Sequence, residues 1–486
     1  MSSTFIQQYT DLPDKFYSHI STDPLNNAKL IHCNQSIAQE LGIDLNEEEI
    51  LAMTAGHKFP DGFMPVAQKY TGHQFGYYNP DLGDGRGVLL GQVKTTNSDN
   101  GKEELWDIHL KGCGQTPYSR RGDGRAVLRS ALREYMIGEA LHGLGIPTTR
   151  CLSLCSNDEW VRREQLEPRA SYIRVAKTHI RFGHFEWLAQ QNDRVGSMLM
   201  AEYVIETVYP ELQDIADNQT RHAALLNLIV QNTAKMIAAW QVVGFCHGVM
   251  NTDNMSVAGE TFDFGPYAFL DDCQIHYICN HSDTEGRYAY SQQPNIGLWN
   301  CRVLANSFSQ LVSSEDIDTA TNLYIDTFNQ TYLQKMGYKF GLTYPVESDK
   351  DFIAETLILL DQSRLDFHLF FTYLAKLEHQ ADEFFNFVGD SKAWQLWSKK
   401  YFERIKTDDS AMRSSLFAQN HPQLIFRNYI AQELIEHLEV GHYSVIDTWI
   451  AALKKPYQID ENGEIDQQYL QAPKNHQKSI ALSCSS

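Results

Sequence analysis

The sequence predicts an α+β protein with two lobes, a small β-rich lobe that carries one key helix and a larger, mainly helical lobe. Two short apolar runs at 87–93 and 105–110 have the character of strands, and the polar stretch 95–102 between them is typical of a hairpin loop. A helix with an apolar face follows at 126–144, where glycine and proline end it. From residue 195 onward the pattern is mostly helical, so strands precede helices along the chain.

Local periodicity predicts the remaining elements of this frame. The helix at 126–144 places Leu128 and Leu132 on one face, and a further strand is expected at 171–176. The segment 222–243 has a broad apolar stripe, which is suited to a central buried helix.

We expect four parts along the chain, and no internal repeat is evident. They are an N-terminal extension at 1–60, the small lobe at 61–190, the helical lobe with its catalytic and metal-binding loops at 191–470, and a flexible polar tail at 471–486.

Composition excludes several classes of protein. With 43% hydrophobic and 12% aromatic residues the chain has the burial capacity of a globular protein. Its 61 acidic against 41 basic residues give a net charge of −20, which argues against general binding of nucleic acid. No run of about 18 apolar residues occurs, so no membrane span is expected. The first residues lack the features of a secretion signal, and we expect a cytoplasmic protein.

The nine cysteines contain no C-x-x-C pair, which argues against a structural zinc site or a disulfide scaffold. Cys484 stands near the end of the polar tail. A thiol in that position is either an idle surface group, which is the more common case, or a redox-active one.

The most informative segment runs from Asp253 to Gly265. Asp253 is followed directly by Asn254, and Asp263 begins an Asp-Phe-Gly triplet. Oxygen ligands of this kind suit Mg²⁺ or Mn²⁺, and they leave one carboxylate free to orient or deprotonate a hydroxyl.

Three further features precede this segment in a meaningful order. A glycine-rich turn at 83–87 is suited to close approach by phosphate, although a plain hairpin turn has the same composition. Lys111 ends a predicted strand, and Glu134 lies 23 positions later inside the predicted helix. Lys111 is either a solvated charge or the partner of Glu134. The order of turn, lysine, glutamate and two aspartates matches that of a protein kinase.

Two details depart from a kinase. Asp253 and Asn254 adjoin, whereas several residues separate their kinase counterparts. A second glycine-rich loop at 120–125 precedes the helix, and Arg174 and Arg181 add further positive charge. A salt bridge to the acidic surface would account equally well for each arginine taken alone.

With these residues identified, the chain resembles the selenoprotein O family over almost its whole length. The resemblance is most specific in eight short stretches, at 70–76, 82–87, 110–112, 116–120, 122–129, 145–149, 181–185 and 247–254. The residues 483–486 resemble those of bacterial members that carry cysteine where some eukaryotic members carry selenocysteine.

The resemblance implies a kinase-like fold that binds ATP in a flipped orientation and transfers AMP to Ser, Thr or Tyr hydroxyls of client proteins. The implied nucleotide contacts are Gly83, Gly85, Arg86, Lys111, Asp123, Gly124, Arg174, Arg181 and Asp263. Asn254 and Asp263 would hold Mg²⁺ or Mn²⁺, Asp253 would act as the base, and Glu134 would pair with Lys111. Cys279 and Cys484 resemble a pair that forms a regulatory disulfide, which would make the tail redox-active.

Three other activities remain open from the sequence. Some bacterial relatives are assigned uridylyl transfer from UTP with Mn²⁺. A kinase would use the same metal site to transfer the γ-phosphoryl group, but the adjoining Asp253 and Asn254 speak against it. A scaffolding pseudokinase would have lost a lysine, a metal ligand or a base, and all are present.

Overall fold

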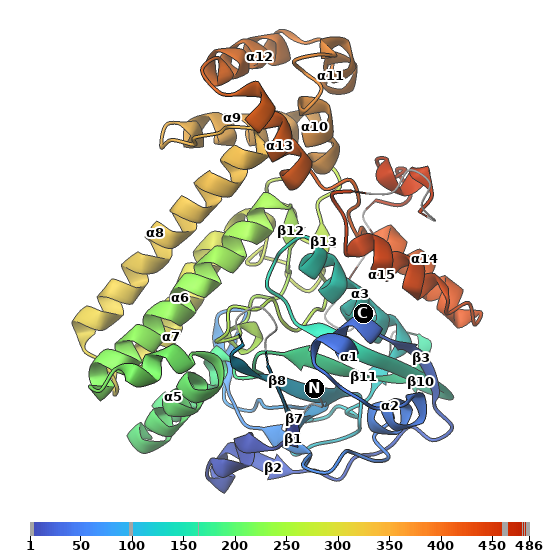
Figure 1. Cartoon of the computed structure of the whole chain (residues 1–486), viewed down its shortest axis with the longest axis vertical. Coiled ribbons are helices and arrows are strands. Elements are labelled where there is room, and N and C mark those ends of the chain that lie inside the picture. The colour runs from blue at the N-terminus through green and yellow to red at the C-terminus, as the bar shows by residue number, and fades with distance from the viewer. Residues whose placement is uncertain are drawn as a thin grey trace.

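The computed structural model describes residues 4–96, 101–163, 165–458, 465–478, 480 and 482. Figure 1 shows a sheet lobe at one end of the molecule, long helices that rise from it, and a cluster of helices at the far end. The expected order of a β-rich lobe and a larger helical lobe is confirmed.

The main sheet has nine antiparallel strands in the order β2-β4-β7-β8-β11-β10-β3, with β1 paired to β7 and β9 to β11. The strands are β1 (Thr4–Ile6), β2 (Tyr17–His19), β3 (Lys29–Cys33), β4 (Val66–Gln68), β7 (Gly87–Thr96), β8 (Glu103–Lys111), β9 (Ala126–Val127), β10 (Arg150–Arg162) and β11 (Leu166–Ala176). The strands expected at 87–93, 105–110 and 171–176 are all present. Half of the predicted hairpin loop at 95–102, residues 97–100, lies outside the described residues.

The first 60 residues, where the sequence predicts an extension, take part in this sheet. Strand β1 pairs with β7 through Phe5 and Val93, and β3 pairs with β10 through Leu154 and His32. Two short helices, α1 (Gln35–Glu40) and α2 (Glu47–Thr54), complete this part of the chain.

Helix α3 (Leu128–Gly143) is the helix predicted at 126–144, and it packs on β10 and β11. Leu132 and Met136 are buried, as the apolar periodicity requires. On its other side α3 contacts α14 (Asn428–Glu439) and α15 (Val445–Leu453), so nearly the whole helix is buried. Glu134 is therefore held in a fixed position at the sheet.

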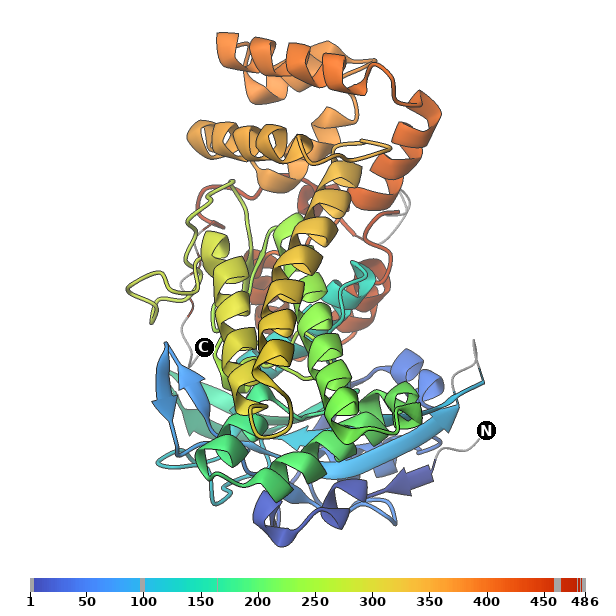
Figure 2. The same cartoon turned by 90° about the vertical axis from the view of Figure 1, so that its left-hand side faces the viewer.

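The helical lobe is built around α6 (Asn218–Val242), which packs on α7 (Gln293–Ser307) and α8 (Ser314–Lys339). Figure 2 shows these three helices side by side above the sheet. Helices α4 (Phe182–Gln190) and α5 (Arg194–Val208) connect them to the sheet lobe. The helix expected at 222–243 corresponds to α6, and its apolar stripe is buried.

Beyond the end of α8, five shorter helices surround a separate aromatic core. They are α9 (Asp349–Ser363), α10 (Phe367–Leu374), α11 (Ala381–Val388), α12 (Lys392–Ile405) and α13 (Ser410–Asn420). Phe370, Trp394 and Trp397 are fully buried at its centre.

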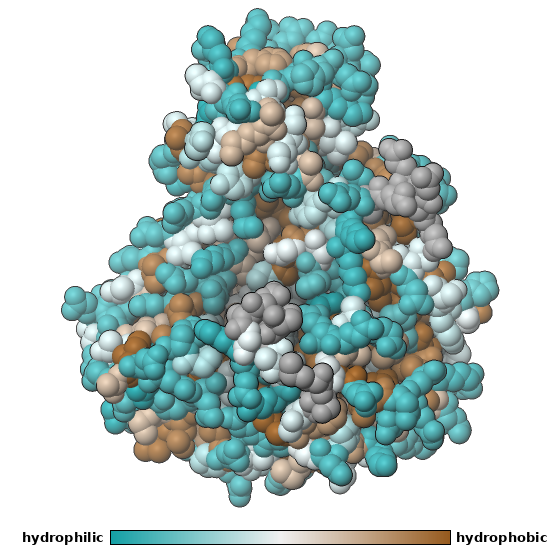
Figure 3. Space-filling model, in the orientation of Figure 1, coloured by the Kyte–Doolittle hydropathy of each residue, from teal (hydrophilic) through white to brown (hydrophobic). Residues whose placement is uncertain are grey.

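The surface agrees with the acidic, polar composition. On the face shown in Figure 3, hydrophilic residues predominate and hydrophobic ones are scattered among them. In the part of the chain that the structure describes, no helix has both the length and the apolar character of a membrane span.

Candidate active site

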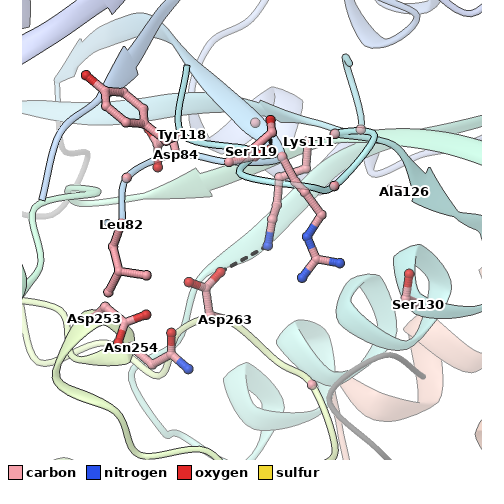
Figure 4. Close-up of a pocket in the computed structure, with 18 of the residues that line it drawn as sticks. Leu82, Asp84, Lys111, Tyr118, Ser119, Ala126, Ser130, Asp253, Asn254 and Asp263 are labelled. Carbon is pink, nitrogen blue, oxygen red and sulfur yellow. Dashed lines mark hydrogen bonds and ion pairs between the residues drawn. The ribbon is translucent and has the colours of Figure 1, made fainter. Parts of the chain in front are cut away.

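A cavity of about 1100 Å³ lies where the two lobes meet, at the upper end of the range for small-molecule sites. Its walls come from the glycine-rich turn, the end of β8, helix α3 and the segments that hold Asp253 and Asp263 (Figure 4). Eleven residues proposed from the sequence line it, namely Gly83, Gly85, Arg86, Lys111, Asp123, Gly124, Glu134, Arg181, Asp253, Asn254 and Asp263. Arg174 and Cys279 do not.

The turn at 83–87 is fixed by its glycines and by a buried aspartate. Gly83 has φ +147°, and a Cβ there would lie 2.4 Å from the Tyr118 ring. Asp84 is buried and accepts a hydrogen bond from Gln68 N at 3.0 Å. Burial opposes ionisation of Asp84, but His109 and Arg181 hold its pKa below the ordinary value. Anchored in this way, the turn presents its backbone to the cavity.

The segment 116–119, which leads directly into the second glycine-rich loop, packs on the first loop. Thr116 Oγ1 donates to the carbonyl of Asp84 at 2.6 Å, and Ser119 Oγ donates to that of Gly85 at 2.5 Å. Gly124 has φ +69°, and a Cβ on it would lie 1.9 Å from the carbonyl oxygen of Gly114. The two loops, which the sequence presents as separate anion sites, therefore form one continuous wall.

Lys111 and Glu134 form the ion pair that kinases use to hold a phosphate-binding lysine, with 3.3 Å between Nζ and Oε2. Lys111 Nζ also lies 3.0 Å from Asp263 Oδ1. Tyr172 donates its hydroxyl proton to Glu134 Oε2 at 2.5 Å. Burial disfavours the charged form of Glu134, but Arg174 and Lys111 keep its pKa below the ordinary value. Glu134 is thus a buried carboxylate that stays ionised.

Arg174 occupies a different position from the one expected for a residue that touches the nucleotide. It is fully buried, and it donates from Nε to Glu134 Oε1 and from Nη2 to Asp263 Oδ1, both at 2.6 Å. Its Nη1 is buried without a hydrogen-bond partner among the described residues. In this conformation Arg174 links two acidic side chains and does not face the cavity.

Asp263 is the most strongly paired carboxylate of the site. Its Oδ1 forms ion pairs with Lys111 and Arg174, and its Oδ2 forms one with Arg181. Burial works against ionisation of Asp263, yet these three cations hold its pKa well below the ordinary value. Its φ of +54° is rare for a residue with a side chain, which marks a backbone held by its surroundings.

Asp253 and Asn254 lie on a short 3₁₀ turn, Thr252–Asn254. Asp253 Oδ2 accepts a hydrogen bond from Gln74 Nε2 at 3.1 Å, whereas its Oδ1 is buried and has no partner among the described residues. Burial raises the pKa of Asp253 to about 7. Asn254 donates a hydrogen bond from its side-chain nitrogen to the carbonyl of Val249 at 3.0 Å, which leaves its side-chain oxygen for a ligand. In Figure 4 these two side chains lie close to Asp263.

The donor set suits a hard divalent cation that also binds phosphate. Asn254 and Asp263 would supply oxygen ligands, and Mg²⁺ is commonly held by only one or two protein groups together with substrate phosphates and water. In this structure the two oxygens of Asp263 contact Lys111, Arg174 and Arg181, so a bound cation would share the carboxylate with them. Within the described ranges no group of three or more His, Cys, Asp or Glu side chains forms a metal cage. The residues present therefore fit a metal that arrives with a nucleotide.

Gln74 was missed by reasoning from the sequence, although it lies in the 70–76 stretch that carries the family resemblance. It is a neutral residue on a short strand, so no charge or spacing signalled its contact with Asp253. Tyr118 and Ser119, which support the glycine-rich turn, were missed for the same reason.

Cys279 is buried behind the cavity wall, with its Sγ 2.7 Å from the carbonyl oxygen of Pro266, which lines the cavity, and 3.4 Å from Cys246 Sγ. Burial raises the pKa of Cys279 well above the ordinary value. The tail reaches this region, because His281 N donates to the carbonyl of Leu482 at 2.9 Å. Cys484 lies outside the described residues, so the predicted disulfide stays a prediction.

Comparison with known proteins gives consistent matches over the chain. The family described as protein adenylyltransferase SelO matches residues 1–457. The chain is 49% identical to a protein of Hydrogenovibrio crunogenus named protein nucleotidyltransferase YdiU, over 98% of this chain and 99% of that protein. It is 44% identical to the Vibrio atlanticus protein of the same name, over 100% and 99% of the two chains.

Proposed function

The chain belongs to the SelO family of protein adenylyltransferases, and we propose that it moves AMP from ATP to Ser, Thr or Tyr hydroxyls of client proteins and of itself. That it is a nucleotidyltransferase follows from the family and from the names of its relatives. The acceptor, the nucleotide and the metal belong to the proposal. The observation that carries it is the pair of carboxylates in one cavity. Asp253 has a buried Oδ1 without a hydrogen-bond partner among the described residues, and Asp263 forms ion pairs with Lys111 and Arg181.

In the proposed reaction the acceptor hydroxyl attacks the α-phosphorus of ATP. A new P–O ester bond forms, the bond from the α-phosphorus to the α,β-bridging oxygen breaks, and pyrophosphate leaves. The hydroxyl proton passes to the carboxylate of Asp253, which lines the cavity and whose Oδ1 has no hydrogen-bond partner among the described residues. A pKa of about 7 suits a group that accepts a proton near neutral pH.

Lys111 and Arg181 supply the positive charge for the phosphates. Both line the cavity, and both are fixed by contacts with Asp263, so little reorganisation is needed when charge develops on the leaving group. Arg181 is buried and still lines the cavity, where it offers a cation to the terminal phosphates of a flipped nucleotide. Arg174 supports this arrangement through Asp263 and Glu134.

Asn254 and Asp263 would hold the Mg²⁺ or Mn²⁺ ion. Such an ion, when bound, would neutralise phosphate oxygens and polarise the α-phosphorus. The glycine-rich wall around Gly83, Gly85 and Gly124 would bring backbone N–H groups close to the nucleotide.

The decisive test uses ATP labelled at the α or at the γ phosphate, with Mg²⁺ or Mn²⁺, a generic protein acceptor and the enzyme alone. Retention of the α label only, lost in Asp263→Ala, is the expected result. Retention of the γ label only would make the protein a kinase and would overturn the proposal. A parallel assay with α-labelled UTP distinguishes adenylyl from uridylyl transfer, because preference for UTP would contradict the choice of ATP.

A further inference from the structure

A small hairpin outside the main sheet covers the Asp253 turn (residues 251–254). Its strands β5 (Gly72–Gln74) and β6 (Tyr77–Asn79) pair with each other and, among the described strands, with no other. The two residues between them, Phe75 and Gly76, have φ of +51° and +87°, as in a type I′ turn. Positive φ is unfavourable for a bulky residue such as Phe75, so surrounding contacts must hold the turn.

Those contacts come from the Asp253 turn and its neighbours. His73 N donates to Thr252 Oγ1 at 2.7 Å, and Phe75 N donates to the hydroxyl of Tyr288 at 2.9 Å. The approach is so close that a Cβ on Gly72 would lie 3.1 Å from Asp253 Cβ. The hairpin is thus built against the segment that carries the proposed base.

Gln74 and Asn79 form a two-step hydrogen-bond chain to Asp253. Gln74 Nε2 donates to Asp253 Oδ2 at 3.1 Å, and Asn79 Nδ2 donates to Gln74 Oε1 at 3.1 Å. Because Asn79 occupies the amide oxygen of Gln74, the amide nitrogen faces the carboxylate. The reverse orientation would place two oxygen acceptors against each other.

These two hydrogen bonds distinguish the two carboxylate oxygens of Asp253. Gln74 occupies Oδ2, so the buried Oδ1, which has no partner among the described residues, is left as the proton acceptor. Gln74 would orient the base in the same way as the third member of a catalytic triad orients the second.

We propose that Gln74 is a positioning residue that fixes the Asp253 carboxylate for proton abstraction, and that Asn79 acts through Gln74. The inference rests on the proposed function, since it assigns the orientation of the same base. It predicts loss of turnover without loss of nucleotide binding, because neither amide is needed to hold the phosphates.

The test compares Gln74→Ala, Asn79→Ala, the double variant and Gln310→Ala. Gln310 donates to Asn192 on the surface, and so serves as a matched control for loss of a Gln–Asn hydrogen bond. The readouts are kcat and KM for transfer of α-labelled AMP, the Kd of a fluorescent ATP analogue, and the thermal unfolding midpoint.

For Gln74→Ala we expect kcat to fall about 10- to 100-fold, less than the loss of the base itself would cause, with Kd and KM for ATP within twofold of wild type. Asn79→Ala should lower kcat by a smaller factor. The double variant should match Gln74→Ala, because Asn79 has no effect once Gln74 is absent. Gln310→Ala should behave as wild type.

Two results would overturn the inference while leaving the proposed function intact. One is wild-type kcat in Gln74→Ala, and the other is a further fall when Asn79→Ala is added to it. If Gln74→Ala is poorly folded, Gln74→Met removes the donor with little change in volume and takes its place. Absence of α-label transfer by the wild type itself would instead remove the proposed function, and the inference with it.

Discussion

Lys111 Nζ lies 3.0 Å from Asp263 Oδ1, and this ion pair joins the end of β8 in the sheet lobe to the segment that follows the Asp253 turn. Glu134 on α3 contacts the same ammonium from the other side at 3.3 Å. Lys111 is therefore shared between two carboxylates before any nucleotide binds. A phosphate that approaches Lys111 meets an amine whose position is already set, so its ordering costs little on binding.

The first prediction concerns the charge of Lys111. We expect Lys111→Met to lower kcat/KM for nucleotidyl transfer roughly 100-fold, because it removes a fixed cation from the phosphate site. The measurement is transfer of α-labelled AMP at several ATP concentrations. Lys335→Met, on an exposed surface of α8, is the control and should retain wild-type activity. A fall of less than threefold in Lys111→Met would contradict this role.

The second prediction separates the two arginines that contact Asp263. Arg174→Ala removes the buried guanidinium that bridges Glu134 and Asp263 and leaves them their contacts with Lys111, so the unfolding free energy should fall by about 3–5 kcal/mol. Arg181→Ala should instead reduce the rise in unfolding temperature that ATP produces, since Arg181 lines the cavity. Denaturant unfolding and thermal unfolding with and without ATP measure both effects. An Arg174→Ala variant as stable as wild type would show that the buried bridge is unimportant.

Much of the fold was predictable because its signals are local. The β7–β8 hairpin and helix α3 follow from apolar periodicity and from the glycines and proline that end the helix. The place of β3 in the sheet was not predicted. Its partner β10 lies more than 100 residues away, and such pairing leaves no mark in a short segment.

The order of the candidate site residues along the sequence was informative, but the contacts between their side chains could not be predicted from it. The sequence identified Lys111, Glu134 and Asp263, because a strand-end lysine, a helix glutamate and an Asp-Phe-Gly triplet in this order are typical of a phosphate-binding site. That Arg174 is buried between Glu134 and Asp263 depends on how β11 packs beside α3, which no spacing encodes. Gln74 was missed because its importance comes from a contact across 179 positions of the chain.

The third prediction concerns the metal. Chelation with EDTA should abolish nucleotidyl transfer, and added Mg²⁺ or Mn²⁺ should restore it, because Asn254 and Asp263 provide too few ligands for tight binding without a nucleotide. Asn254→Ala should raise the metal concentration for half-maximal activity by about tenfold or more, because loss of a group that only supports a ligand already costs about 10- to 100-fold in metal affinity. Metal titrations of the wild type and the variant measure this change. Full activity in EDTA would exclude a metal requirement.

The fourth prediction concerns Gly124 in the second glycine-rich loop, whose backbone packs against Gly114. A Cβ at this position would collide with the carbonyl of Gly114, and its φ of +69° disfavours any side chain. Gly124→Ala should therefore displace the loop and weaken ATP binding roughly tenfold. Gly122→Ala is a milder change in the same loop, since its φ is not in the left-handed region and a Cβ there would lie 3.1 Å from the carbonyl oxygen of Ser119, which a small shift relieves. Isothermal titration with ATP compares the two variants, and equal affinities would contradict the prediction.

The last prediction concerns a buried lysine far from the cavity. Lys339 Nζ donates to the carbonyl of Val242 at 2.8 Å and lies 4.6 Å from the centre of the Phe371 ring. The titratable groups that face it are His368 and His421, and no carboxylate pairs with it among the described residues.

Burial lowers the pKa of Lys339 to about 7, whereas an unfolded lysine has a pKa of about 10.4. Between these values the unfolded chain binds a proton that the folded chain does not, so wild-type stability is lost as pH falls from about 10 to about 7. Lys339→Met removes this cost. The variant should be more stable than wild type at pH 7, and its advantage should shrink by up to about 1.4 kcal/mol per pH unit toward pH 10. Urea unfolding of both proteins at pH 7, 8.5 and 10 measures the difference, in which the other titrating groups cancel. A difference that stays constant with pH would mean that Lys339 is charged in the folded protein.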